Sequence, residues 1–141
     1  NTKLEIFWIT IPSILLLVIF FWGFKGFIIT LQPPANSIEV YATGKQWSWD
    51  FTYPNGETKP NELVVPVNTP VKVIMTSQDV IHSFFVPSFR VKRDVLPYRY
   101  TVLWFEATKV GEFDLYCTEY CGLDHSKMIG HVRVVETLRC L

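Results

Sequence analysis

The feature that most constrains the fold is an uncharged apolar segment near the N-terminus. Residues 6–24 contain no Asp, Glu, Lys or Arg, and the apolar run resumes after Lys25 and continues to Leu31. At about 1.5 Å per residue, a helix of this length can cross a hydrocarbon core of about 30 Å. The segment is too long for the apolar part of a signal peptide, and no small-residue cleavage site follows it. It therefore predicts a membrane-spanning helix.

Two consecutive prolines, Pro33 and Pro34, mark the end of this helix, because neither can continue it and both favour extended chain. We expect residues 1–35 to form the helix and its linker, and residues 36–141 to form one separate domain. The chain has 13 basic and 13 acidic residues, and nearly all of them lie in the second part. That domain is therefore close to neutral, which argues against a nucleic-acid partner.

Short runs of β-branched and aromatic residues, separated by turn residues, follow the linker. Residues 54–56 (Pro-Asn-Gly) and 66–70 (Pro-Val-Asn-Thr-Pro) supply turns. Apolar and polar side chains alternate over residues 112–117, as in a half-buried strand. This pattern predicts one all-β antiparallel sandwich. The candidate strands are residues 38–42, 46–53, 62–66, 71–77, 99–107, 112–117 and 130–136.

Potential metal ligands are concentrated in residues 117–128. This segment contains Cys117, Cys121, His125 and Met128, and His82 lies 35 residues before the first cysteine, at the end of a strand-like run. Soft sulfur and nitrogen ligands select copper or zinc over magnesium, calcium or manganese. If the segment folds back against the strand next to His82, two Cys, two His and one Met can surround a metal.

Four kinds of structure could explain this segment: a disulfide, a zinc site, a mononuclear copper site and a dinuclear copper centre. Cys117 and Cys121 can form a disulfide if the domain is extracytoplasmic. A closed structural zinc site would use two cysteines and two histidines, but it leaves Met128 without a role. A mononuclear blue-copper site uses two His, one Cys and a weak axial Met. The segment has this set plus one cysteine, and two thiolates can bridge two copper ions, which favours a dinuclear copper centre.

Five short motifs, spread over almost the full length of the chain, occur in the order typical of a known protein family. They are Glu5-Ile-Phe-Trp-Ile-Thr-Ile-Pro12, Gly44-Lys-Gln-Trp-Ser-Trp49, Val65-Pro-Val-Asn-Thr-Pro70, Asp79-Val-Ile-His-Ser83 and the segment 117–128. Together they resemble subunit II of the cytochrome c oxidase family, the haem–copper terminal oxidases. In that family the dinuclear copper centre, called CuA, accepts electrons from cytochrome c. The electrons pass to haem in subunit I, where O2 is reduced to water and protons are pumped.

This resemblance implies the cupredoxin form of the sandwich and a complete set of copper ligands. Both cysteines bridge the two copper ions, and each histidine binds one of them. A thioether and a backbone carbonyl are weak ligands on opposite sides. The implied ligands are His82, Cys117, Glu119 (through its carbonyl oxygen), Cys121, His125 and Met128. The carboxylate of Glu119 is implied to reach a magnesium or manganese ion at the boundary with subunit I, a suitable hard cation for it.

The resemblance also implies roles for residues outside the copper ligands. Trp47 is the residue through which electrons enter, whereas Trp49 is a packing residue. Glu5 stands at the entrance of a proton pathway into subunit I. The implied partners are subunit I with its haem and CuB, other oxidase subunits, a cytochrome c and the lipid bilayer. We expect the copper domain on the periplasmic face of a bacterial inner membrane rather than on the mitochondrial one.

Departures from the family pattern concern the electron donor. Gln78 stands where the family often has an acid before Asp79, and Arg90 and Arg93 follow the first histidine. Acidic patches attract basic cytochromes over long distances. With this patch diluted, we expect weaker electrostatic steering and a membrane-bound or tethered donor.

Two other functional classes fit some of the same features. One is a CuA domain of a different enzyme, such as nitrous oxide reductase or a copper-containing nitric oxide reductase; the other is a structural zinc module on a membrane anchor. Quinol oxidases are disfavoured because they have lost the copper ligands. The family usually has two membrane helices in this subunit, and only the second is seen here. Cys140 is expected to be an unpaired thiol.

Overall fold

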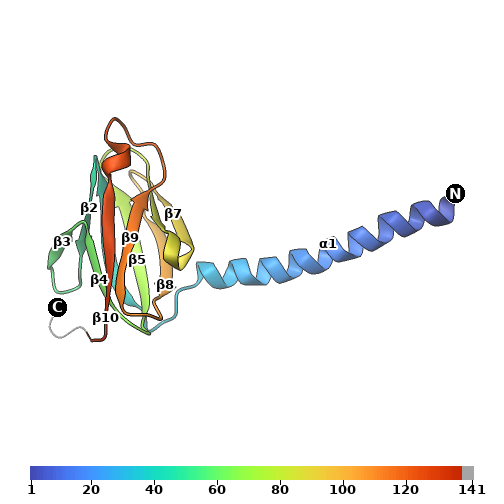
Figure 1. The fold of residues 1–141 in the computed structure, drawn as a ribbon, viewed down its shortest axis with the longest axis horizontal. Helices are drawn as coiled ribbons and strands as arrows, with labels where there is room; N and C mark the ends of the chain where they lie inside the picture. Colours follow the sequence, from blue (N-terminus) through green and yellow to red (C-terminus); the bar gives the residue numbers. More distant parts are fainter. Residues whose placement is uncertain (138–141) are drawn as a thin grey trace. The chain divides into compact units, whose positions relative to one another are not determined.

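The computed structural model describes residues 1–137, so Cys140 lies outside the described residues. The chain divides into two units, Asn1–Gln32 and a second unit that begins at Pro33. The first is a single helix and the second is a β-sandwich (Figure 1).

Helix α1 (Thr2–Leu31) occupies the predicted apolar segment and is about 45 Å long at 1.5 Å per residue. It continues through Pro12 and ends before Gln32 and the two prolines. None of its residues is buried within the structure. Among residues 1–137, it is the one helix long and apolar enough to cross a membrane.

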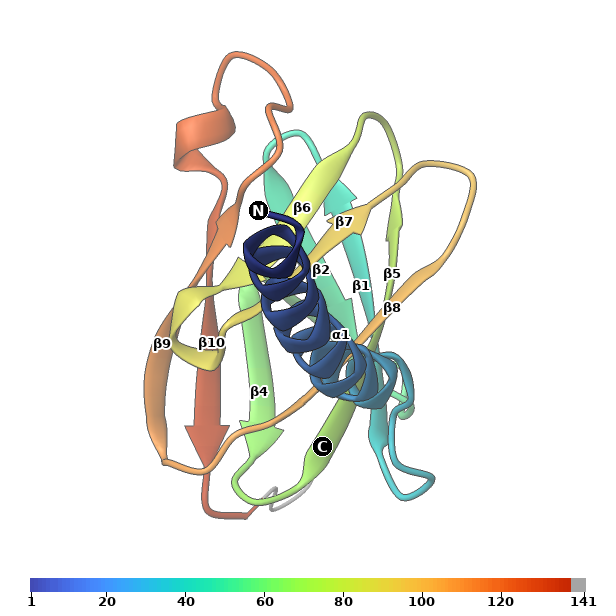
Figure 2. The same cartoon turned by 90° about the vertical axis from the view of Figure 1, so that its right-hand side faces the viewer.

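Two five-stranded sheets pack face to face in the second unit (Figures 1 and 2). The strand order is β3-β2-β1-β5-β8 in one sheet and β4-β10-β9-β6-β7 in the other. The strands are β1 (Ile38–Lys45), β2 (Ser48–Thr52), β3 (Thr58–Pro60), β4 (Glu62–Pro66), β5 (Pro70–Ser77), β6 (His82–Val86), β7 (Val91–Val95), β8 (Thr101–Glu106), β9 (Gly111–Cys117) and β10 (Ile129–Val135), with two short 3-10 helices, η1 (Pro87–Phe89) and η2 (His125–Lys127).

The sheets are mixed rather than purely antiparallel, which corrects the prediction. β1 pairs with β5 in parallel, and β4 pairs with β10 in parallel, whereas the remaining pairs are antiparallel. The cause is the path of the chain, which leaves the first sheet after β3, crosses to form β4 and returns as β5. A strand that returns from the other sheet can lie parallel to its neighbour, whereas a hairpin cannot.

Three strands, β3, β6 and β7, were not predicted from the sequence. β3 has three residues and ends on a proline, so it lacks a recognisable pattern. β7 is an edge strand with three charged residues in five, a composition that discourages pairing with other chains. His82, which the sequence placed at the end of a strand, is instead the first residue of β6.

The core lies between the sheets and is built from inward-facing residues of both. Trp49 and Phe51 of β2 contact Phe84 of β6 edge-to-face, with ring centroids 5.9 and 6.5 Å apart. All three side chains are fully buried. The packing role expected for Trp49 is therefore confirmed. On β9, Leu115 and Cys117 are buried while their neighbours are not, as the alternation predicted.

Tyr53 connects the two sheets through hydrogen bonds to β4. It follows β2, and its hydroxyl group donates to the carbonyl oxygen of Val64 (3.1 Å) and accepts from the Val64 N–H (2.7 Å). Val64 lies in β4, an edge strand of the other sheet. Burial raises the pKa of Tyr53 to about 12, so the hydroxyl stays protonated over the usual pH range.

Replacing Tyr53 by phenylalanine is expected to destabilise the domain by about 1–3 kcal/mol, because both backbone groups of Val64 lose their partner in a buried position. Denaturant unfolding of the full chain in detergent, without metal, measures this loss. Tyr116→Phe is the matched control, since it removes only an exposed bond to Asp114. Equal stability of the two variants would contradict the role of Tyr53.

Candidate metal centre

Three loops meet at one end of the sandwich (Figure 2), and the predicted ligands lie in or next to two of them. The loops are the β1–β2 turn, the β5–β6 loop and the β9–β10 loop. His82 is the first residue of β6 and Cys117 is the last residue of β9. Because Phe84 pairs with Cys117 across these neighbouring strands, His82 lies just beyond the cysteine at the same end of the sheet.

The β9–β10 loop is closed by backbone hydrogen bonds at its base. The Cys117 N–H donates to the carbonyl of Met128 (3.3 Å), and the Thr118 N–H donates to the carbonyl of Ser83 (3.1 Å). Inside the loop, the His125 N–H donates to Gly122 (3.1 Å), and the Met128 N–H donates to His125 (3.2 Å). These bonds fold residues 117–128 back toward β6.

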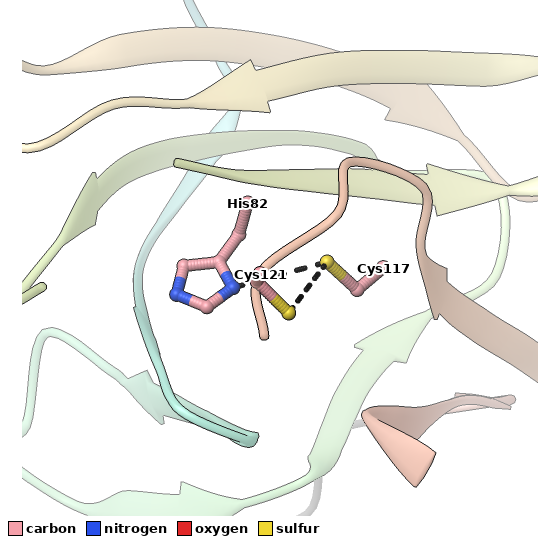
Figure 3. Close-up of side chains that lie close together, drawn as sticks. All are labelled: His82, Cys117 and Cys121. Carbon is pink, nitrogen blue, oxygen red and sulfur yellow. Dashed lines mark hydrogen bonds between the residues drawn. The ribbon is translucent and has the colours of Figure 1, made fainter. Parts of the chain in front are cut away.

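The two cysteine sulfur atoms form the centre of the site (Figure 3). They lie 3.8 Å apart, and Sγ of Cys117 is 3.8 Å from Nδ1 of His82. Sγ of Cys117 is also 3.3 Å from the carbonyl oxygen of Glu119. Sγ of Cys121 is 3.4 Å from Nδ1 of His125 and 3.9 Å from Sδ of Met128. The structure thus brings all six predicted ligands to one pair of sulfur atoms.

Most of the centre is shielded from solvent, although His125 is partly exposed. His82 is fully buried, and Cys121 and Met128 are 2% and 1% exposed. Both cysteines are free thiols, so the pair is held in contact without a disulfide. Nδ1 of His82 and the two sulfur atoms lie within 4.8 Å of one another.

Electrostatics within the cysteine pair favour one negative charge in the absence of metal. Burial opposes ionisation of Cys117, but hydrogen bonds from His82 and from the backbone lower its pKa to about 6. Burial and the neighbouring Cys117 charge raise the pKa of Cys121 to about 12. Two thiolates side by side therefore need added positive charge, and cations that bind there must displace the second proton.

Asp79 orients His82 by a hydrogen bond to the ring nitrogen that faces away from the cysteines. Oδ1 of Asp79 lies 2.8 Å from Nε2 of His82, on the opposite side of the ring from the cysteines. Burial disfavours the charged imidazole, but hydrogen bonds to Cys117 and Asp79 raise the pKa of His82. A carboxylate at Nε2 fixes the proton there and leaves Nδ1 as the metal-binding atom.

The β1–β2 turn contacts the ligand loop directly. Nε1 of Trp47 donates to the carbonyl oxygen of Cys121 (3.3 Å), and Nε2 of Gln46 donates to the same oxygen (2.8 Å). The sequence identified Trp47, but it did not reveal the contacts of Gln46 or the bond from Asp79 to His82. Both depend on how separate loops pack together, which local sequence patterns do not encode.

Two glutamates were also predicted as site residues. The side chain of Glu119 is exposed, while its carbonyl faces Cys117. Glu5 lies in the first turn of α1, in the other unit of the chain. Its role at a proton pathway stays a prediction.

The donor set fits a copper centre. Two buried thiolates are costly unless their charges are balanced by bound cations. Imidazole and thioether groups are soft enough for copper, and a closed zinc site would not use Met128, which is buried against Cys121.

The family model for the periplasmic domain of cytochrome c oxidase subunit II matches residues 57–135, more than half of the chain. The chain belongs to this family. The predicted fold class, a cupredoxin-like β-sandwich preceded by one apolar helix, is confirmed as well. The helix and the family domain together fit a membrane-anchored protein.

Individual relatives agree with the family match. Cytochrome c oxidase subunit 2 of Metridium senile is 33% identical over 152 residues, which cover 91% of this chain and 61% of that protein. The periplasmic domain of the Bradyrhizobium japonicum subunit II is 39% identical, with a TM-score of 0.71, covering 74% of this chain and 88% of that one.

A second solved structure concerns the cysteines of a relative. It is a mixed disulfide intermediate between a thioredoxin-like protein and subunit II of cytochrome c oxidase, 39% identical to this chain, with a TM-score of 0.66 over 75% of this chain and 87% of that one. The chain spans between 50% and 61% of the length of the first curated relatives that it matches.

Proposed function

We propose that the chain is the electron-accepting subunit of a respiratory cytochrome c oxidase, with a dinuclear copper centre at residues 82 and 117–128. The observation that carries this proposal is the convergence of all six ligands on two buried sulfur atoms 3.8 Å apart. Two bridged copper ions would supply a shared valence electron, so that gain or loss of one electron changes the bond lengths little. The O2 chemistry belongs to subunit I.

The residues of the chain then have distinct tasks. Cys117 and Cys121 would hold the metal pair, while His82 and His125 would each bind one ion. The sandwich keeps water from the sulfur atoms, which tunes the redox potential. Met128 and the carbonyl of Glu119 are weak ligands, and the exposed Glu119 carboxylate is free to reach a magnesium or manganese ion at the boundary with subunit I.

Trp47 is the proposed point at which electrons arrive. Its indole N–H bonds the carbonyl oxygen of Cys121, so one hydrogen bond and the atoms of one residue separate the ring from a copper ligand. Electrons tunnel more readily along bonds than through empty space. Trp49 contacts His82 at 6.0 Å between ring centroids, but it is fully buried and therefore inaccessible to a donor.

The surface around the ligand loop supports contact with partner proteins. Tyr120 and Leu123 are 76% and 88% exposed, and Ile81 is exposed as well. Apolar groups of this kind at the edge of a metal centre favour short-range docking. The proposed partners are a cytochrome c, soluble or tethered, and subunit I, with the domain on the periplasmic face of a bacterial inner membrane. Glu5 is proposed to serve the proton pathway.

Metal content and spectroscopy test the proposal. We expect the full chain, loaded with copper in detergent, to bind two copper ions per chain. The oxidised centre should show an EPR spectrum with hyperfine splitting from both copper nuclei and an intense visible thiolate-to-copper absorption. A single zinc ion in native material, or one copper ion with splitting from one nucleus, would contradict it.

A further inference from the structure

One residue of the β1–β2 turn is bonded to both sides of the metal centre. The side-chain amide of Gln46 donates to the carbonyl oxygen of Cys121 at 2.8 Å. The backbone N–H of Gln46 donates to Oδ2 of Asp79 at 2.7 Å. The other oxygen of Asp79 holds Nε2 of His82 at 2.8 Å. Gln46 therefore connects the histidine side of the site with the cysteine loop.

The ligand loop is shaped for this contact. Gly122 has a φ of +120°, a backbone conformation that residues with a side chain rarely adopt. A Cβ atom at this position would lie 2.8 Å from Nε2 of Gln46 and 3.3 Å from two atoms of the Trp47 ring. The loop backbone thus lies directly against the turn, and the small size of Gly122 allows the two hydrogen bonds to the Cys121 carbonyl.

We propose that Gln46 is a positioning residue of the copper centre. Its side chain holds the Cys121–Gly122 backbone against the turn that carries Trp47. Without its amide N–H, the carbonyl of Cys121 keeps only the longer bond from Trp47, at 3.3 Å. The loop then opens more often, and the distance between the indole and the thiolate ligand fluctuates. Any effect of Gln46 on bound copper rests on the proposed function. The hydrogen bond from Gln46 to the ligand loop, however, is a property of the metal-free chain.

The test compares two substitutions of Gln46, one that removes the hydrogen-bond donor of its side chain and one that retains a donor. Gln46→Met has a similar length and no charge but cannot donate, while Gln46→Lys retains an N–H donor. In the metal-free full chain in detergent, amide hydrogen exchange of residues 118–128 is followed by mass spectrometry. We expect exchange about 2- to 10-fold faster in Gln46→Met, the change expected for loss of one hydrogen bond. Gln46→Lys should remain close to the wild type.

A matched control and a copper measurement complete the experiment. Gln78→Met makes the same change at an exposed glutamine on the neighbouring loop and should leave loop exchange unaltered. After copper loading, Gln46→Met should keep the wild-type copper content but show an altered EPR splitting. Wild-type exchange in Gln46→Met, or equal acceleration in Gln46→Lys, would overturn the proposal. Because exchange is measured without metal, this result does not depend on which metal the site binds.

Discussion

Replacing Cys117 by serine is expected to abolish the proposed dinuclear copper centre. Its sulfur lies 3.8 Å from both His82 Nδ1 and Cys121 Sγ, and 3.3 Å from the Glu119 carbonyl, so one change removes the shared contact of three ligands. A serine hydroxyl is a poor, hard ligand for copper and stays protonated at neutral pH. Copper content should fall to one ion per chain or fewer, and the splitting from two nuclei should disappear from the EPR spectrum.

The remaining cysteine provides the control for this change. Cys140→Ser makes the same substitution at the thiol that the sequence leaves out of the site, and it should retain two copper ions and the wild-type spectrum. Metal-free Cys117→Ser should keep the circular dichroism of the β-sandwich, because serine differs from cysteine by one atom and is no larger. Two copper ions with an unchanged spectrum in Cys117→Ser would exclude a bridging role for Cys117.

The sequence predicted which residues converge better than it predicted the topology. Cys, His and Met are chemically distinctive, and four such candidate ligands fall within residues 117–128, so this cluster can be recognised from the residue types alone. The strand β6 that carries His82 was missed, because it is a short run without alternation. The parallel pairing of β1 with β5 was also missed, since it depends on a crossover between sheets and not on the pattern within either strand.

Contacts that orient the ligands could not be predicted either. The bond from Gln46 to the Cys121 carbonyl joins residues 75 positions apart. It forms only because the β1–β2 turn and the ligand loop lie at the same end of the sandwich. Gly122 carried a weak signal, as a glycine directly after a ligand can indicate close approach of another backbone or side chain. Nothing in the sequence, however, identified what approaches it.

Removing the carboxylate of Asp79 is expected to weaken copper binding by about 10- to 100-fold, the usual cost of losing a hydrogen-bond partner of a metal-binding histidine. In Asp79→Ala, Nε2 of the fully buried His82 loses its partner, and the backbone N–H of Gln46 loses its acceptor as well. The imidazole is then free to place its proton on Nδ1, the atom that faces Cys117. Competition with a chelator of known affinity measures the change in the full chain.

Two comparison variants show whether Asp79 acts by orienting His82 or through its negative charge. Asp79→Asn keeps an oxygen that can accept from His82 Nε2 while removing the negative charge, so its loss of affinity should be clearly smaller than that of Asp79→Ala. Asp114→Ala removes an exposed carboxylate of β9 that bonds the Tyr116 hydroxyl at 3.0 Å, and it should bind copper as the wild type does. If Asn and Ala at position 79 weaken binding equally, the carboxylate acts through its charge. If neither weakens it, His82 is oriented by the surrounding core, which includes Trp49 at 6.0 Å between ring centroids.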